Sequence, residues 1–171
     1  SDFTPTLNHV ILNVLDNVRN RLYVLTRVDG KWQREPLPGM PEFGTVSVDA
    51  VDDEENDDYF LTVTDYVTPT SLLLGTVGKG APEKLKQLPA FFEAEGLVVA
   101  QHEATSKDGT RIPYFQVARQ DLALDGSNPT LLYGYGGFEV SMVPGYSGSV
   151  GSAWLEKGGV YVVANLRGGG E

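Results

Sequence analysis

Two glycine-rich runs, each directly after a short apolar stretch, constrain this chain more than any other feature of its sequence. The first, Tyr133–Phe138 (YGYGGF), follows Pro129–Leu132, and the second, Arg167–Glu171 (RGGGE), follows the strand-like Gly159–Leu166. Glycine adopts backbone conformations that other residues avoid, and it lets the backbone come close to another group. The pattern predicts that each strand ends in a turn that glycine backbones make, of the kind that shapes a binding site.

The residues before about position 90 predict strands and no helix. The alternating or apolar runs are Val10–Leu15, Arg21–Val28, Lys31–Glu35, Thr45–Val51, Tyr59–Thr64 and Ser71–Val77. Asp29-Gly30 is a strong hairpin signal, and residues 81–89 are expected to form a connection. Short strands at this spacing are typical of a β-sandwich or a propeller, and at about 40–45 residues per blade there is room for roughly two blades.

After residue 90 the pattern changes from all-β to α/β. A hairpin is expected first, followed by the two strands that precede the glycine-rich runs. Between those strands Gly151–Lys157 predicts a helix end stopped by glycine. The order strand, loop, helix, strand is that of an α/β unit, and Val160–Ala164 suit a strand buried on both faces. We therefore expect two domains, residues 1–90 and residues 91–171.

Charge and composition narrow the possible partners. The formal net charge of −10 argues against nucleic acid and anionic membranes, because a basic surface supplies most of the affinity for them. No apolar run is long enough to span a membrane. The chain has no cysteine and two histidines, so we expect no metal site and no cofactor. The acidic run Asp52–Asp58 lacks the spacing of a calcium-binding EF-hand and is interpreted as a solvated loop. The compartment is unknown.

Tyr135 is the candidate for chemistry that the residues themselves indicate. In α/β hydrolases a loop after an early strand, often rich in glycine, presents hydrogen-bond donors to the oxyanion of the reaction. A tyrosine hydroxyl can be such a donor. The alternative is that Tyr135 is an aromatic residue at a sheet edge beside a plain turn, and the pattern leaves both interpretations open.

No nucleophile or base in the chain fits a hydrolase. Ser147 lies in the run GYSGS, which has serine at the fifth position of a G-x-S-x-G elbow and no strand before it, so it is interpreted as a loop serine. His9 and His102 precede it, whereas the catalytic histidine of an α/β hydrolase follows the serine. Arg167 is expected to pair with Glu171 or, alternatively, to face a cleft.

Three segments resemble the prolyl oligopeptidase family of serine peptidases: Ser106–Pro113, Leu132–Phe138 and Ala164–Glu171. The resemblance is strong over residues 93–171, and residues 1–90 resemble, more weakly, the last blades of that family's β-propeller. It implies all-β propeller blades followed by the first part of an α/β-hydrolase domain, incomplete in this chain. It also implies short peptide substrates, cleaved typically after proline.

The resemblance implies roles for four residues. Tyr135 matches the tyrosine whose hydroxyl helps to stabilise the oxyanion. Phe138 matches an aromatic residue that lines the S1 pocket for the proline ring, and Gly136 and Gly137 allow the turn. The family's Ser/Asp/His triad lies downstream of its Arg-Gly-Gly-Gly-Glu motif, so this chain holds none of the three residues.

We therefore expect a fragment of a serine-type oligopeptidase that is inactive alone. Such a piece would leave a blade face and the valine-rich strand Val160–Ala164 uncovered, so it is expected to self-associate. The alternative is a non-catalytic β-rich binding or interaction module, which would explain the strands and the acidity but not three family motifs in order.

Overall fold

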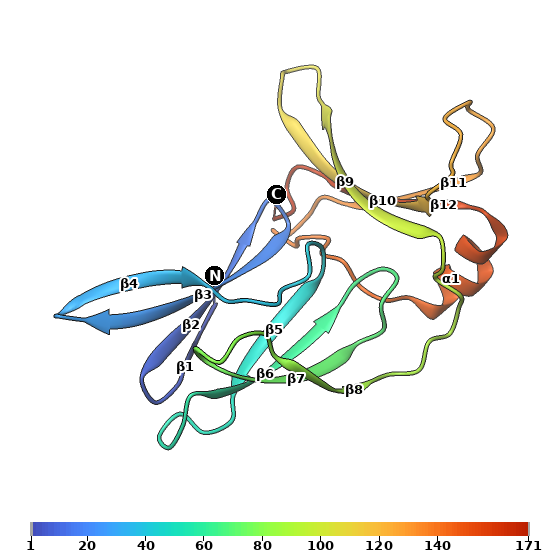
Figure 1. The fold of residues 1–171 in the computed structure, drawn as a ribbon. Helices are drawn as coiled ribbons and strands as arrows, with labels where there is room; N and C mark the ends of the chain where they lie inside the picture. Colours follow the sequence, from blue (N-terminus) through green and yellow to red (C-terminus); the bar gives the residue numbers. More distant parts are fainter. Residues whose placement is uncertain (1, 171) are drawn as a thin grey trace. The chain divides into compact units, whose positions relative to one another are not determined.

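The computed structural model describes residues 2–170, and the contacts within it divide them into two compact units. The first unit holds the described residues up to Asp65 together with Pro69–Leu88. The second holds Tyr66–Thr68 together with the described residues from Pro89 on. Figure 1 follows the chain through both units, which are described separately below.

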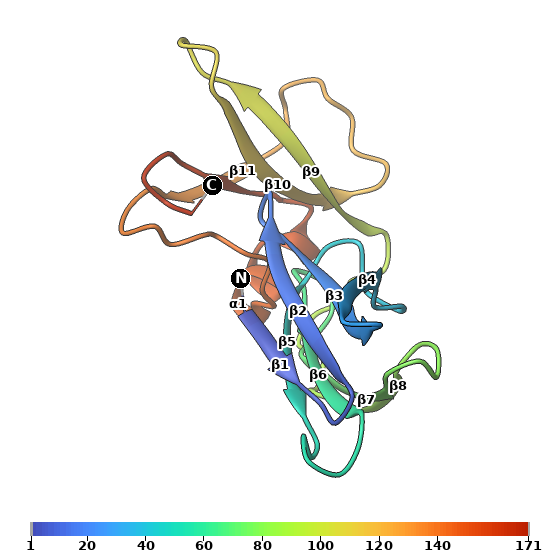
Figure 2. The same cartoon turned by 90° about the vertical axis from the view of Figure 1, so that its left-hand side faces the viewer.

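The first unit consists of two four-stranded antiparallel sheets, in each of which every strand pairs with the next along the chain (Figure 2). The strands are β1 (Asp2–Pro5), β2 (His9–Asp16), β3 (Arg19–Val28) and β4 (Lys31–Pro36) in one sheet, and β5 (Thr45–Ala50), β6 (Asp58–Thr64), β7 (Ser71–Thr76) and β8 (Glu83–Gln87) in the other. Apolar residues of both sheets form one core, in which Ile11 and Leu22 join Tyr59 and Leu61. Two successive four-stranded meanders are the arrangement of propeller blades.

Every strand predicted for this unit is present, whereas β1 and β8 were not predicted. Asp29 and Gly30 have φ angles of 50° and 78° and turn the chain between β3 and β4, as the hairpin signal predicted. The expected connection over residues 81–89 is wrong, because β8 occupies Glu83–Gln87. All of its residues are exposed at the sheet edge. A strand that buries neither face leaves no alternation in the sequence to reveal it.

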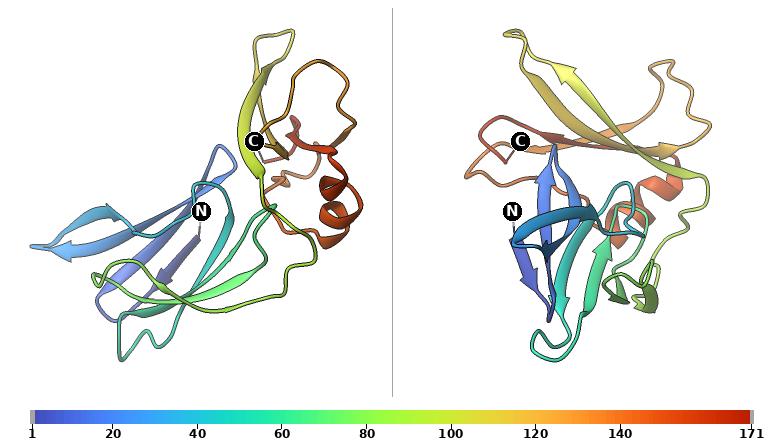
Figure 3. Two further views of the ribbon diagram at one scale, coloured as in Figure 1. Left: turned by 45° about the vertical axis from the view of Figure 1, so that its right-hand side comes forward. Right: turned by 60° about the vertical axis from the view of Figure 1, so that its left-hand side comes forward.

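The second unit contains one sheet, with the strands in the order β11-β12-β10-β9. Its strands are β9 (Leu97–Thr105), β10 (Arg111–Arg119), β11 (Thr130–Tyr135) and β12 (Val160–Asn165). β10 pairs antiparallel with both of its neighbours, whereas β11 and β12 are parallel. Figure 3 shows the helical segment that leads into β12 in orange and red.

That helical segment is shorter than a regular helix and has two pieces. Helix α1 (Gly148–Ala153) begins at Ser147, whose hydroxyl accepts a hydrogen bond from the Val150 N–H. A turn of 3-10 helix, η1 (Leu155–Lys157), follows and ends at Gly158, whose φ of 82° is left-handed. The predicted glycine stop is confirmed.

The expectation that Val160–Ala164 forms an exposed edge is wrong. β12 lies between β11 and β10, and its Val160 and Val163 are almost completely buried. The edge strands are β9 and β11, and all six residues of β11 are exposed. The order of strands in a sheet depends on where the connection returns the chain, and local sequence does not record that.

Candidate active site

The two glycine-rich loops lie together because they follow neighbouring parallel strands. Tyr135 at the end of β11 pairs with Asn165 at the end of β12. Both loops therefore begin at the carboxyl ends of their strands, side by side. Beyond the strands, the Glu139 N–H donates a hydrogen bond to the Gly168 carbonyl over 3.1 Å. The loop after β11 is therefore packed directly on the loop after β12.

Gly136 is the glycine of the first loop that this packing requires. Gly136 and Gly137 do not adopt positive φ, whereas Phe138 and Glu139 do, at 54° and 55°. A Cβ atom placed on Gly136 would lie 2.8 Å from the Arg167 carbonyl oxygen, closer than real Cβ contacts. The glycines therefore do not supply the left-handed residues of this turn, whereas the predicted close approach of the backbone is present at Gly136. Glycine stands at position 136 because another backbone approaches it there.

Tyr135 and Phe138 are both accessible on this loop. The Tyr135 side chain passes Gly137, where an added Cβ would lie 3.4 Å from the tyrosine hydroxyl oxygen. Within residues 2–170 that hydroxyl has no hydrogen-bond partner. Phe138 is 92% exposed, the most exposed large apolar side chain in the described part of the chain. The structure thus brings the four residues singled out in the sequence into one loop, and their roles stay predictions.

Asn165 supports this loop, and the sequence analysis missed it. The residue is buried at the end of β12. Its Oδ1 accepts a hydrogen bond from the Met142 N–H over 2.7 Å, and its Nδ2 donates to the Met142 carbonyl. Nearby, the Ser141 hydroxyl donates to the Gly170 carbonyl over 2.7 Å. A polar residue that closes an otherwise apolar buried strand is a signal that could have identified Asn165, because buried amides need partners.

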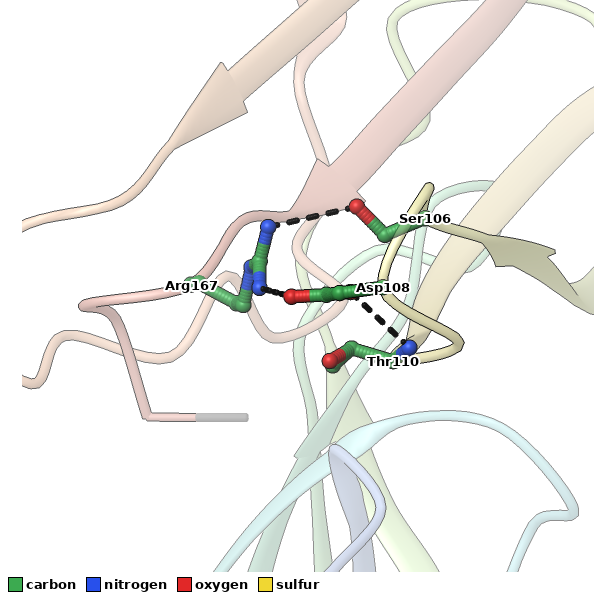
Figure 4. A network of polar contacts seen from close by, with 4 residues as sticks. All are labelled: Ser106, Asp108, Thr110 and Arg167. Carbon is green, nitrogen blue, oxygen red and sulfur yellow. Dashed lines mark hydrogen bonds and ion pairs between the residues drawn. The ribbon is translucent and has the colours of Figure 1, made fainter.

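Arg167 pairs with an acid that the sequence analysis did not single out. Its guanidinium donates to the Asp108 carboxylate and, over 3.2 Å, to the Ser106 hydroxyl, both in the turn between β9 and β10 (Figure 4). Glu171, the expected partner, lies outside the described residues. The Thr110 backbone N–H and the Arg167 guanidinium lower the pKa of Asp108 to about 2. Asp108 therefore stays ionised throughout the physiological range.

The other polar candidates have local partners. His9 Nδ1 is hydrogen-bonded to the Thr26 hydroxyl over 2.8 Å, and the His102 ring packs against Tyr114 with the ring centroids 5.3 Å apart. Ser147 caps α1. In the described residues, no group of three or more His, Asp or Glu side chains could hold a metal ion. None of the helices described here is long and apolar enough to cross a membrane.

Residues 52–55 of the acidic run lie exposed in a turn, as the solvated-loop interpretation predicted. The Asp52 carboxylate accepts hydrogen bonds from the backbone N–H groups of Glu54 and Glu55. The Asp57 carboxylate accepts from Thr6 and Asn8. These carboxylates thus close a turn and tie it to the strand connection before β2.

Comparison with known proteins places the chain among peptidases. No family profile matches it. An uncharacterized peptidase of Sinorhizobium fredii is 45% identical over 98% of this chain and 23% of its own length. The prolyl endopeptidase of Elizabethkingia miricola is 39% identical over 83% of this chain and 20% of its own. Among solved structures, a prolyl endopeptidase superposes with a TM-score of 0.85 and 36% identity, over 100% of this chain and 24% of the other.

The chain belongs to the prolyl oligopeptidase family. The resemblance of the three sequence motifs is thereby confirmed. A post-proline cleaving enzyme from Rickettsia typhi has the same arrangement, with a TM-score of 0.80 at 32% identity. The four-stranded sheets match the β-propeller region of these peptidases. The chain spans about a quarter of the length of the relatives that it matches.

Proposed function

We propose that this chain is part of a serine-type peptidase that hydrolyses short peptides after proline, and that it contributes an oxyanion-binding tyrosine and part of the S1 pocket. Residues 1–90 would be the C-terminal blades of the propeller, and residues 91–171 the N-terminal part of the α/β-hydrolase domain. The observation that carries the proposal is the Tyr135 hydroxyl, which has no hydrogen-bond partner among residues 2–170 and lies at the end of a parallel strand, next to a loop that a second loop supports.

The proposed role of Tyr135 follows from the charge that develops during acyl transfer. When a nucleophile attacks the scissile carbonyl, negative charge accumulates on its oxygen. A hydroxyl fixed in advance stabilises that charge without reorganising, and a donor of this kind is worth about 3–4 kcal/mol in the transition state. Tyr135 suits the task because its backbone is paired with β12 and no described group competes for its proton.

Phe138 supports a pocket for an apolar ring. The side chain is 92% exposed, and its residue holds a φ of 54°, a conformation that costs a bulky residue about 1–3 kcal/mol. Backbone strain that presents an aromatic ring outward is typical of a ligand-binding loop. A proline ring packed on that face would bury apolar surface of both partners.

The chain contributes no triad in this proposal. His9 is bonded to Thr26, His102 packs on Tyr114, and Ser147 caps a helix, so none is positioned as a nucleophile or base. Covalent catalysis needs a nucleophile activated by an adjacent base. We therefore expect the 171-residue chain to show no peptidase activity by itself.

The experiment is Tyr135→Phe in the complete gene product that carries this chain, assayed with a proline-linked chromogenic peptide. We expect kcat to fall by roughly ten- to a thousandfold with little change in KM, because the hydroxyl acts in the transition state. The matched control is Tyr133→Phe on the same exposed strand, which should change kcat by less than about twofold. An unchanged kcat for Tyr135→Phe would show that Tyr135 is only an aromatic residue at the sheet edge and does not bind the oxyanion. Turnover by the 171-residue chain, blocked by a serine-directed inhibitor, would contradict the proposal that this chain contributes no catalytic triad.

A further inference from the structure

The turn between β9 and β10 is closed by internal hydrogen bonds. The Ser106 N–H donates to the Thr110 carbonyl over 2.8 Å, and the Gly109 N–H donates to the Ser106 carbonyl over 2.9 Å. The Asp108 carboxylate accepts from the Thr110 N–H over 3.1 Å. These bonds set the direction of the Asp108 side chain, which faces the Arg167 guanidinium in Figure 4.

Asp108 holds Arg167 in place by direct contact. Both side chains are half-exposed, so solvent screens the charge attraction and the pair contributes little stability on its own. Its geometry is more informative than its energy. One guanidinium nitrogen binds Asp108 and another binds Ser106, so the arginine is fixed at two points on the same turn.

The backbone of Arg167 in turn contacts the loop that carries Tyr135. The Arg167 carbonyl oxygen lies where a Cβ on Gly136 would approach it to 2.8 Å. The next residue, Gly168, accepts the hydrogen bond from Glu139. Arg167 and the adjacent Gly168 therefore link the β9–β10 turn to both ends of the segment from Gly136 to Glu139, directly after Tyr135.

We propose that Asp108 is a positioning residue for the peptidase reaction: through Arg167 it fixes the loop that aims the Tyr135 hydroxyl. This inference rests on the proposed function. Its chemical reason is that a reacting group displaced by about 1 Å can lose on the order of a hundredfold in rate. Removing the Asp108 charge frees Arg167 and lets the loop shift by a fraction of that distance.

The kinetic test is Asp108→Asn in the complete gene product, with concentrations set by active-site titration. We expect kcat to fall about 3- to 30-fold with KM within about twofold. The matched control is Asp125→Asn. Like Asp108, Asp125 accepts a hydrogen bond from the backbone N–H two residues further on, which is that of Ser127, but no arginine of the described residues binds its carboxylate. The control should leave kcat unchanged.

A double-mutant cycle separates positioning from a general structural role. In a Tyr135→Phe background Asp108→Asn should lower kcat by less than about twofold, since the hydroxyl that it aims is gone. An equal fall in both backgrounds would overturn the proposal, as would no fall in the wild-type background.

A second measurement does not depend on activity. In the 171-residue chain at low micromolar concentration, hydrogen exchange of the Glu139 amide should be at least about fivefold faster in Asp108→Asn than in wild type or in Asp125→Asn. If Tyr135→Phe proves kinetically silent, the proposed function fails, and an unchanged Glu139 exchange rate would show separately that Asp108 does not order the loop.

Discussion

Gly136→Ala tests whether contact between the two loops explains the glycine at that position. The added methyl would lie 2.8 Å from both the Arg167 carbonyl oxygen and the Leu166 Cβ, well inside the 3.4 Å at which ordinary contact begins. Overpacking of this kind costs about 1–3 kcal/mol. Replacing glycine also reduces the entropy of the unfolded chain, which offsets about 0.4–1 kcal/mol. The net expectation is a loss of roughly 1–2 kcal/mol.

The matched control is Gly137→Ala in the same loop. Its nearest neighbour would be the Tyr135 hydroxyl at 3.4 Å, and its φ is not positive, so it should stay within about 0.5 kcal/mol of wild type. Urea unfolding followed by Trp154 fluorescence reports on the second unit once the other tryptophan is removed by Trp32→Phe. With an m-value of about 1–2 kcal/mol/M, Gly136→Ala should lower the midpoint by roughly 1 M. Equal midpoints for the two variants would refute the packing argument.

Three further outcomes are expected. Phe138→Ala in the complete gene product should raise KM for proline substrates severalfold, because it removes ring-packing surface from ground state and transition state alike; an unchanged KM would exclude Phe138 from the pocket. The isolated chain should self-associate through the exposed edge of β11, so Leu132→Lys should reduce the mass seen by light scattering while Leu124→Lys in a loop should not; a monodisperse wild-type monomer would contradict this. The pKa of Asp108 is lowered when the chain is folded, so the stability that its ionised form contributes is present above about pH 4 and lost as the pH falls toward 2. The stability difference between wild type and Asp108→Asn, measured by urea unfolding, should accordingly vanish in that window, and a constant difference would show that the carboxylate charge is not responsible.

Local patterns in the sequence were sufficient to predict a strand where one of its faces is buried, and to predict a turn where its residues favour the turn's backbone conformation. The alternation in Thr45–Val51 and Tyr59–Thr64 predicted β5 and β6, because burial of one face imposes a period of two on the residues. Asp29-Gly30 predicted its hairpin because both residues tolerate positive φ. The motif around Tyr135 predicted the family and the loop that presents Tyr135 and Phe138.

The tertiary structure alone determined the strand order and the contacts between the loops. β12 is central and β11 is an edge strand because of where the crossover returns the chain, and both strands are apolar enough for either place. The need for glycine at position 136 comes from the close approach of the Arg167 backbone, 31 positions further along the chain. No local sequence pattern indicates that approach. Arg167 pairs with Asp108 of a distant turn, since strand pairing brings the β9–β10 turn beside the end of β12. Sequence determines which groups the chain carries, and packing between remote segments determines which of them meet.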